Sequence, residues 1–204
     1  QLLRADFESR PTADLLAQSV ADFRDISRGV NSIVISDYGK GGLTHIEEMI
    51  QIAKDRDIPV IVDPKGVDYS RYQGATLVTP NRDEFELATG VGTGNPAFVD
   101  TAHELVRSAE LSGLLVTCGE EGMTLFLSTG EVLHQDAAAR EVFDVSGAGD
   151  TVVAIIAVGV AAGLTWAECI KWATLGASAV VSRFGTSVVR KSDVNLTVAA
   201  DVER

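Results

Sequence analysis

A glycine run that ends in a carboxylate is the part of this sequence with the clearest chemical meaning. Residues 144–150 read DVSGAGD, and an apolar segment of helical length follows them. Small residues let neighbouring backbone N–H groups point into one space, and a helix adds its positive N-terminal end, so Gly147, Ala148 and Gly149 predict an anion hole. Asp150 could accept the proton of an attacking hydroxyl beside that hole, as a base does in phosphoryl transfer. The alternative is an ordinary helix cap behind a turn.

A second candidate segment places an amide and carboxylates at the start of a predicted helix. Asn81 and Glu84 are three residues apart and share a helix face, where they could hold phosphate oxygens through Mg²⁺ and water. Arg82 and Asp83 lie between them and belong to the same candidate nucleotide segment. The spacing also fits a capping box, so a purely structural role is the alternative.

A third segment, Thr117 to Gly122, follows a predicted strand and precedes a predicted hairpin. Gly119 and Gly122 are three residues apart, and two such glycines permit a flat ring or a phosphate to approach the backbone closely. Thr117, Gly119 and Gly122 are therefore candidate nucleotide contacts. A plain turn is the alternative.

Two Asp–Lys pairs follow neighbouring predicted strands. Asp37 and Lys40 come after one strand, and Asp63 and Lys65 come after the next. A lysine in this position could hold a substrate phosphate or the charge of a nucleotide, and the aspartate could accept hydroxyl hydrogen bonds or orient the lysine. The alternative is a structural ion pair within a loop.

Short apolar strands alternate with helices along the chain. Helices are expected over 12–27, 44–56, 81–89, 96–112, 150–162 and 166–183. Strands are expected over 2–7, 32–36, 59–62, 76–79 and 114–117, with a hairpin over 123–128 and 131–135. This order is typical of a parallel sheet covered on both faces, in which ligands bind beyond the carboxyl ends of the strands. One domain is expected over residues 1–204.

Composition limits the expected partners. The formal net charge is −12 and no basic stripe is present, so nucleic acid is not an expected partner. The longest apolar stretch, around 151–164, is shorter than the roughly 20 residues that span a bilayer. Cys118 and Cys169 lack the spacing of a disulfide framework or a zinc site, which favours a cytoplasmic setting without membrane contact.

The order of these motifs resembles the ribokinase-like (PfkB) carbohydrate kinase family. N-x-x-E, T-x-G-x-x-G and the glycine run occur in sequence, and SDYGKGGL, VDPKG, ATLVTPNRDEFE, DVSGAGDT and FGTS look like its heptose kinase branch. The resemblance covers residues 1–192. It implies an α/β fold, a three-layer α/β/α sandwich with a mostly parallel sheet. It also implies phosphorylation of D-glycero-D-manno-heptose 7-phosphate at the anomeric hydroxyl, a step towards ADP-heptose and lipopolysaccharide.

The resemblance assigns roles to matching positions. Asp150 is similar to the family's catalytic base, and 147–149 matches its anion hole. The segments 81–84 and 117–122 match its ATP and Mg²⁺ segment and its nucleotide loop. The implied cofactors are therefore ATP and Mg²⁺.

Metal ligands and further partners are implied in the same way. Glu84 is the expected Mg²⁺ ligand, and Asp144 with the region of Gly185 resembles the elements that hold a monovalent cation in some members. A sugar phosphate and ATP are the expected small-molecule partners. The family also implies a homodimer for the full-length protein.

Two features of the family are not found in these 204 residues. The family's glycine-rich sugar-binding segment and its small β lid precede the motifs above, so we expect a partial kinase domain with weak nucleotide binding and slow turnover. The H-x-G-H motif of an adenylyltransferase domain is also not found, and that activity is not expected. The alternative functions are another sugar or nucleoside kinase of this family, or a non-catalytic nucleotide-binding fragment.

Overall fold

The fold is built on one six-stranded sheet with the order β1-β2-β3-β4-β5-β6. The computed structural model describes residues 9–138, 141–190 and 193. The strands are β1 (Ile33–Ser36), β2 (Val60–Asp63), β3 (Leu77–Val78), β4 (Gly113–Thr117), β5 (Met123–Leu127) and β6 (Val132–Gln135). The first four run parallel, whereas β5 and β6 join as antiparallel strands. The predicted mostly parallel sheet and its terminal hairpin are confirmed.

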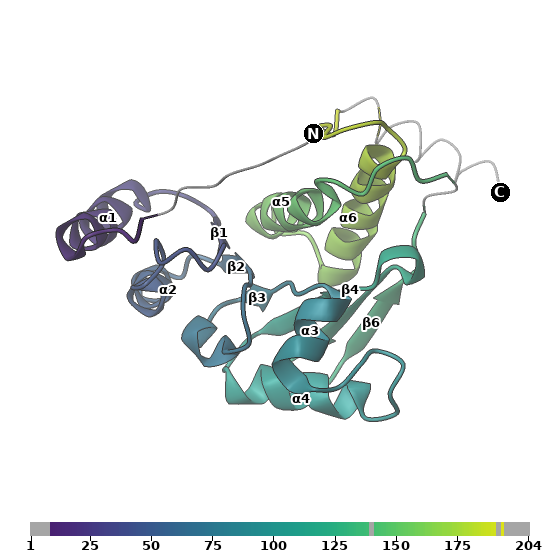
Figure 1. The fold of residues 1–204 in the computed structure, drawn as a ribbon, viewed down its shortest axis with the longest axis horizontal. Helices are drawn as coiled ribbons and strands as arrows, with labels where there is room; N and C mark the ends of the chain where they lie inside the picture. Colours follow the sequence, from purple (N-terminus) through teal and green to yellow (C-terminus); the bar gives the residue numbers. More distant parts are fainter. Residues whose placement is uncertain (1–8, 139–140, 191–192, 194–204) are drawn as a thin grey trace.

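Helices cover both faces of this sheet and give the predicted three layers. They are α1 (Ala13–Ile26), α2 (Ile46–Lys54), α3 (Arg82–Thr89), α4 (Phe98–Ser108), α5 (Ala148–Ala161) and α6 (Trp166–Val181), with 3-10 turns at η1 (Tyr69–Tyr72) and η2 (Gly119–Glu121). Figure 1 shows α5 and α6 together on one side, and α3 and α4 on the other. The strand expected over 2–7 lies outside the described residues.

The apolar strands lie between two hydrophobic cores. In β2, Val60 and Val62 belong to the core that includes α2 and α4, whereas Ile61 belongs to the core beneath α5 and α6. The same alternation places Leu114 and Leu115 of β4 in different cores. Because successive side chains of a strand point to opposite faces, burial on both sides requires the continuous apolar runs seen in the sequence.

Local capping explains where several helices begin and end. Thr165 and Glu168 form a capping box at the start of α6, and Gly90 ends α3 in the left-handed conformation with φ of 74°. The predicted end of α4 at residue 112 is wrong, because Glu110 adopts a positive φ of 50° and the Leu111 N–H donates to the Val106 carbonyl. After this turn the chain continues into β4.

Two further expectations concern cysteines and membranes. Cys118 and Cys169 are free thiols buried in the interior, and burial raises the pKa of each. Within residues 9–138, 141–190 and 193, no helix is long and apolar enough to cross a membrane.

Candidate active site

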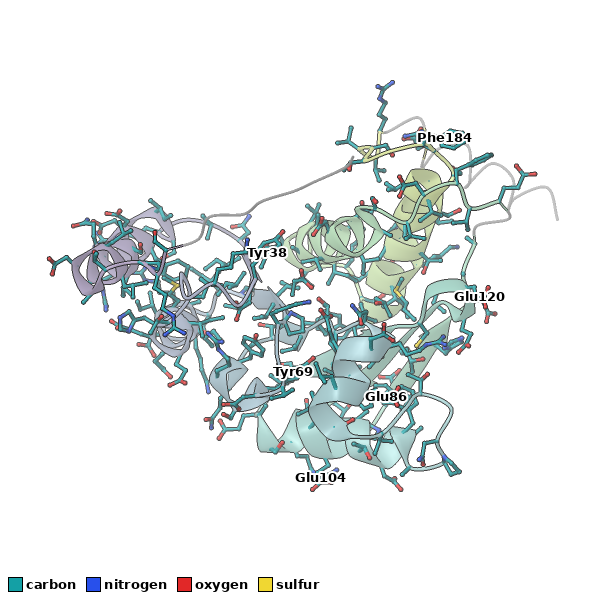
Figure 2. All side chains as sticks on the ribbon, in the orientation of Figure 1. Tyr38, Tyr69, Glu86, Glu104, Glu120 and Phe184 are labelled. Carbon is teal, nitrogen blue, oxygen red and sulfur yellow. The ribbon has the colours of Figure 1, made fainter. Side chains whose placement is uncertain are left out.

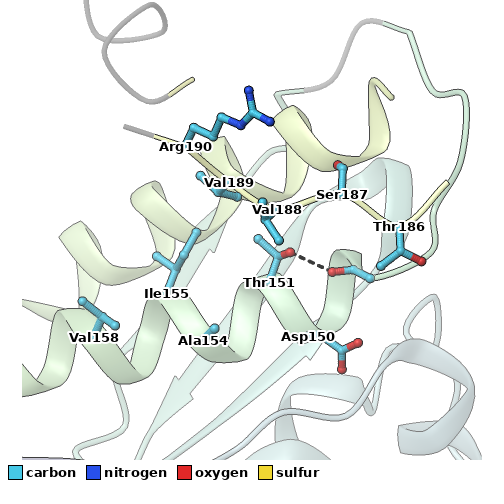
Figure 3. Close-up of a pocket in the computed structure, with 11 residues that line it drawn as sticks. Asp150, Thr151, Ala154, Ile155, Val158, Thr186, Ser187, Val188, Val189 and Arg190 are labelled. Carbon is cyan, nitrogen blue, oxygen red and sulfur yellow. Dashed lines mark hydrogen bonds between the residues drawn. The ribbon is translucent and has the colours of Figure 1, made fainter. Parts of the chain in front are cut away.

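The glycine run forms the loop that leads into α5. Gly147 is the N-cap residue with φ of 82°, a conformation that residues with a side chain rarely adopt. The Thr151 hydroxyl donates to the Gly147 carbonyl at 2.8 Å (Figure 3). The Ala148 N–H turns back to the Val145 carbonyl at 3.2 Å. Since the first N–H groups of a helix lack partners within the helix, the next residues of this turn can present theirs to an anion.

Two cavities share this loop. Gly147 and Asp150 line a cavity of about 720 Å³, and Ala148 and Gly149 line another of about 470 Å³. The glycine run therefore forms a wall common to both cavities. Asp150 stands at the start of α5, with its exposed carboxylate directed away from the apolar side chains of the larger cavity (Figure 3).

The smaller cavity contains all three predicted residues of the nucleotide loop. Thr117, Gly119 and Gly122 line it. Val152 and Val181 are among its other lining residues and contribute apolar surface. An apolar cavity beside a glycine loop and a helix N-terminus suits a flat ring that carries phosphates.

Close backbone contact requires one of the glycines in this loop. A β-carbon on Gly122 would lie 2.0 Å from the Gln135 carbonyl oxygen, and the φ of Gly122 is 87°. Arg82, at the start of α3, donates to the Cys118 carbonyl at 2.8 Å and pairs with Glu121 at 3.0 Å. The sequence placed Arg82 in the nucleotide segment. The structure shows that it fastens that segment to the glycine loop.

The segment from Asn81 to Glu84 forms the capping box that was the alternative interpretation. The Asn81 side chain accepts from the Glu84 N–H at 2.9 Å, and Glu84 Oε2 accepts from the Asn81 N–H at 3.1 Å. Glu84 also has a second partner, since Lys65 Nζ donates to Glu84 Oε1 at 3.0 Å. Asp83 is exposed in the same first turn. The cap and a role in the site are therefore compatible.

Carboxylates gather where β2 ends. Burial raises the pKa of Asp63, and the neighbouring carboxylates of Glu84 and Asp150 raise it further. Lys65 partly offsets this effect on Asp63. The pKa of Lys65 is itself raised, chiefly by its hydrogen bond to Glu84. The structure therefore brings together four residues that the sequence placed in three separate segments.

Asp37 is buried, whereas a residue that contacts substrate directly would be exposed to the site. Its carboxylate is buried and accepts from the Gly39 N–H at 2.8 Å and from the Tyr72 hydroxyl at 3.0 Å. Arg71 forms an ion pair with it at 3.3 Å. Tyr72 and Arg71 were missed by the sequence reasoning, because no motif spacing connects the 3-10 turn η1 with the end of β1.

None of the four predicted substrate residues lines either cavity described above. Asp37 and Lys40 belong to the loop after β1, and Asp63 and Lys65 lie at the end of β2. The two loops touch, because the Asp37 N–H donates to the Asp63 carbonyl at 2.9 Å. The four residues thus lie at one edge of the sheet, as expected for the carboxyl ends of parallel strands.

Asp144 holds the glycine run to the loop after α6. Its carboxylate accepts from the Ser146 N–H at 2.8 Å and from the Gly185 N–H at 3.2 Å. The bonds to Ser146, followed by the bond to Gly185, lower the pKa of Asp144. The rings of Phe143 and Phe184 lie 4.9 Å apart across the same two loops, and Figure 2 labels Phe184 there.

The two predicted metal ligands do not lie in one ready-made cluster. Glu84 faces Lys65, whereas Asp144 bonds to the loop at Gly185. Over the residues placed by the structure, no group of three or more His, Cys, Asp or Glu side chains is arranged to hold a metal ion. This arrangement is compatible with Mg²⁺, which commonly uses one or two carboxylates together with substrate phosphates.

Sequence comparison places the chain among kinases. Residues 14–192 match the pfkB family carbohydrate kinase. The chain is 47% identical over 195 residues to D-beta-D-heptose 7-phosphate kinase of Bordetella bronchiseptica, covering 95% of the chain and 62% of that protein. It is 43% identical over 201 residues to bifunctional protein HldE of Hydrogenovibrio crunogenus, covering 95% and 40% respectively. The chain thus spans between 40% and 62% of the length of these relatives.

Solved structures share the fold. Phosphofructokinase-2 from Escherichia coli in complex with potassium superposes with a TM-score of 0.81 at 21% identity, covering 99% of this chain and 67% of that one. Ribokinase from Arabidopsis thaliana, complexed with ribose and ATP, gives a TM-score of 0.71 at 21% identity, covering 93% and 60%. These likenesses confirm the ribokinase-like α/β sandwich.

Proposed function

The chain belongs to the pfkB family of carbohydrate kinases, and from this premise we propose that it serves ATP-dependent phosphoryl transfer to a sugar hydroxyl. The observation that carries the proposal is the position of the glycine run. Its residues line two cavities, one shared with the glycine loop at Gly119 and the other with Asp150. A phosphoryl group that passes along this common wall would travel from a nucleotide to a hydroxyl beside Asp150.

The proposed reaction uses the residues at the start of α5. The acceptor hydroxyl oxygen attacks the γ-phosphorus of ATP, the bond from that phosphorus to the bridging oxygen breaks, and ADP leaves. Asp150 takes the proton of the hydroxyl, a contribution typically of about 10² to 10⁴ in rate. The N–H groups of Gly149 and Asp150 stabilise charge on the transferring group, because the helix N-terminus points its dipole at that position.

Cations would complete the site. Mg²⁺, when bound, supplies positive charge for the β- and γ-phosphate oxygens. Glu84 and Asp63 would hold it; burial raises the pKa of Asp63, and the nearby carboxylates of Glu84 and Asp150 raise it further, which supports a site for a cation. A monovalent cation would bind where Asp144 meets Gly185, because the Asp144 carboxylate keeps lone pairs beyond its two N–H bonds.

The acceptor that we propose is D-glycero-beta-D-manno-heptose 7-phosphate, converted to the 1,7-bisphosphate on the route to ADP-heptose and lipopolysaccharide. The names of the relatives support this choice over other sugars. A sugar phosphate also needs a cation, and Lys40 follows β1 at the edge of the sheet where the site lies. The wall of the larger cavity along Ala154 and Val158 is apolar, so we assign sugar recognition to its end at Asp150.

A substrate panel tests the proposal. The chain is incubated with Mg²⁺ and γ-labelled ATP and offered heptose 7-phosphate, fructose 6-phosphate or ribose, with the chain in excess so that slow transfer is detected. Transfer chiefly to the heptose phosphate supports the proposal. Transfer chiefly to another acceptor favours a different sugar kinase, and ATP binding without transfer to any acceptor favours a non-catalytic nucleotide-binding fragment.

A further inference from the structure

Lys65 is held at several points, although more than half of its side chain is exposed. Its N–H donates to the Tyr72 hydroxyl at 3.0 Å, and its carbonyl oxygen lies 3.1 Å from the same hydroxyl. The stem passes Gly39, where an added β-carbon would lie 3.6 Å from Lys65 Cγ. The ammonium ends 3.0 Å from Glu84. The Tyr72 contacts fix the backbone of Lys65, so the ammonium reaches Glu84 from a defined position although 55% of the side chain is exposed.

The oxygen that Lys65 contacts is the one that Glu84 does not use in its helix cap. Glu84 Oε2 accepts from the Asn81 N–H, which leaves Oε1 as the oxygen directed away from the capping box. Lys65 Nζ covers that oxygen. A cation that coordinates Glu84 through Oε1 would therefore compete with the ammonium for that oxygen.

We propose that Lys65 is a positioning residue that occupies Glu84 Oε1 while the site is empty and moves to the phosphate oxygens of ATP when a divalent cation replaces it. This inference rests on the proposed function, because it assumes that ATP and a divalent cation enter together. A lysine suits this exchange, since its ammonium is a compact charge on a flexible stem. An arginine held in a two-pronged contact would exchange less readily.

The position of Lys65 makes the second contact reachable. The residue lies two positions beyond the end of β2, and α5 packs on β2. Asp150, at the start of α5, and Lys65 both lie near enough to Asp63 to affect its pKa, after the larger effects of burial, Glu84 and Ser36. Phosphates bound beside Asp150 would therefore lie near Lys65. The ammonium also interacts favourably with the carboxylates of both Glu84 and Asp63, which repel each other.

The test compares two lysine substitutions with the same change in net charge. Lys65→Met removes the ammonium and keeps most of the stem. Lys54→Met is the matched control, because Lys54 is 53% exposed and forms an ion pair of 3.9 Å with Glu110. Binding of Mn²⁺ alone is followed by electron paramagnetic resonance of the free ion. Binding of ATP at saturating Mg²⁺ is followed by calorimetry, and circular dichroism checks the fold of each variant.

We expect the two ligands to respond in opposite directions. Lys65→Met should bind Mn²⁺ about threefold more tightly, because a half-exposed ion pair no longer competes for Glu84. It should bind ATP about tenfold more weakly, because a charge-assisted contact to phosphate is lost. In a Glu84→Gln background, Lys65→Met should leave Mn²⁺ affinity unchanged. Lys54→Met alone should change neither the Mn²⁺ affinity nor the ATP affinity.

The outcomes separate this inference from the proposed function. Equal Mn²⁺ affinity in Lys65→Met and Lys54→Met overturns the competition between Lys65 and a cation for Glu84. Unchanged ATP affinity in Lys65→Met overturns the contact of Lys65 with the phosphates. A general structural role of Lys65 would weaken both ligands together and would also contradict the inference. Failure of the unaltered chain to bind ATP overturns the proposed function, and the Mn²⁺ comparison then still decides whether Lys65 covers Glu84.

Discussion

Two buried tyrosines on the 3-10 turn η1 offer a sharp test of how the loops of the site are held. Tyr72 and Tyr69 are 0% and 2% exposed, and their rings lie 5.6 Å apart. The Tyr72 hydroxyl contacts the Asp37 carboxylate and both backbone groups of Lys65. The Tyr69 hydroxyl has no hydrogen-bond partner among the residues that the structure places. Removal of the two hydroxyls should therefore have different consequences.

The loss of stability expected for Tyr72→Phe follows from the hydrogen-bond partners that the Tyr72 hydroxyl leaves unpaired. Burial raises the pKa of Tyr72 to about 12, so the hydroxyl remains a donor to Asp37 throughout the neutral range. A hydrogen bond to a charged group contributes about 1.5–3 kcal/mol, and the buried Asp37 and the Lys65 N–H each lose a partner. We expect the free energy of unfolding to fall by about 2–3 kcal/mol, which lowers the urea midpoint by about 1 M.

Tyr69→Phe is the matched control because it removes the same atom from the same turn. Since the Tyr69 hydroxyl gains no hydrogen bond to offset its burial, its removal should leave stability unchanged or raise it by up to about 1 kcal/mol. Urea unfolding followed by fluorescence measures both variants under one set of conditions. Equal destabilisation by the two substitutions, or a larger loss in Tyr69→Phe, would refute the reasoning.

Three further substitutions test the glycine loop and the start of α6. Gly122→Ala should destabilise the chain by about 3 kcal/mol or more, because its β-carbon would meet the Gln135 carbonyl. A β-carbon on Gly119 would have open space, so Gly119→Ala should cost only the strain of a positive φ, about 1–2 kcal/mol. Thermal unfolding compares the two variants. The pKa of Glu168 is lowered below 4.5, first by its bond to the Thr165 side chain and then by the bond to the Thr165 N–H. The charged form therefore stabilises the fold above pH 4.5 and loses this effect as the pH falls through the lower folded-state pKa. Glu168→Gln should accordingly be less stable than the unaltered chain at pH 7 and should lose less stability on acidification, as urea unfolding at both pH values would show.

The layers of the fold could be predicted from the sequence because burial on two faces leaves a visible pattern. Val60, Ile61 and Val62 form an unbroken apolar run, which in a strand indicates contact on both sides. Capping residues gave the starts of several helices for a similarly local reason, as at Asn81. The end of α4 was harder to predict, because the positive φ at Glu110 is an unusual backbone choice that side-chain periodicity does not reveal.

The site was predictable to the extent that its motifs are contiguous in sequence. The glycine run and the loop at Gly119 were both singled out from the sequence, and in the structure they line one cavity; their roles in binding are proposals. Contacts between distant segments were not predictable. Asp37 meets Tyr72 at a separation of 35 residues, and Lys65 meets Glu84 at 19. Such pairs depend on which strands lie side by side, and a single sequence carries no spacing rule for them.

Asp150→Asn tests the central claim most directly. The amide keeps the size of the side chain but cannot accept the proton of the attacking hydroxyl. Under single-turnover conditions with heptose 7-phosphate and Mg²⁺, we expect phosphoryl transfer from γ-labelled ATP to slow by about 10²- to 10⁴-fold. Calorimetry should show that ATP affinity is kept or somewhat increased, because Asp150 does not line the cavity of the glycine loop and the substitution removes a negative charge beside the phosphates. Transfer at the rate of the unaltered chain would contradict the assignment of Asp150 as the base.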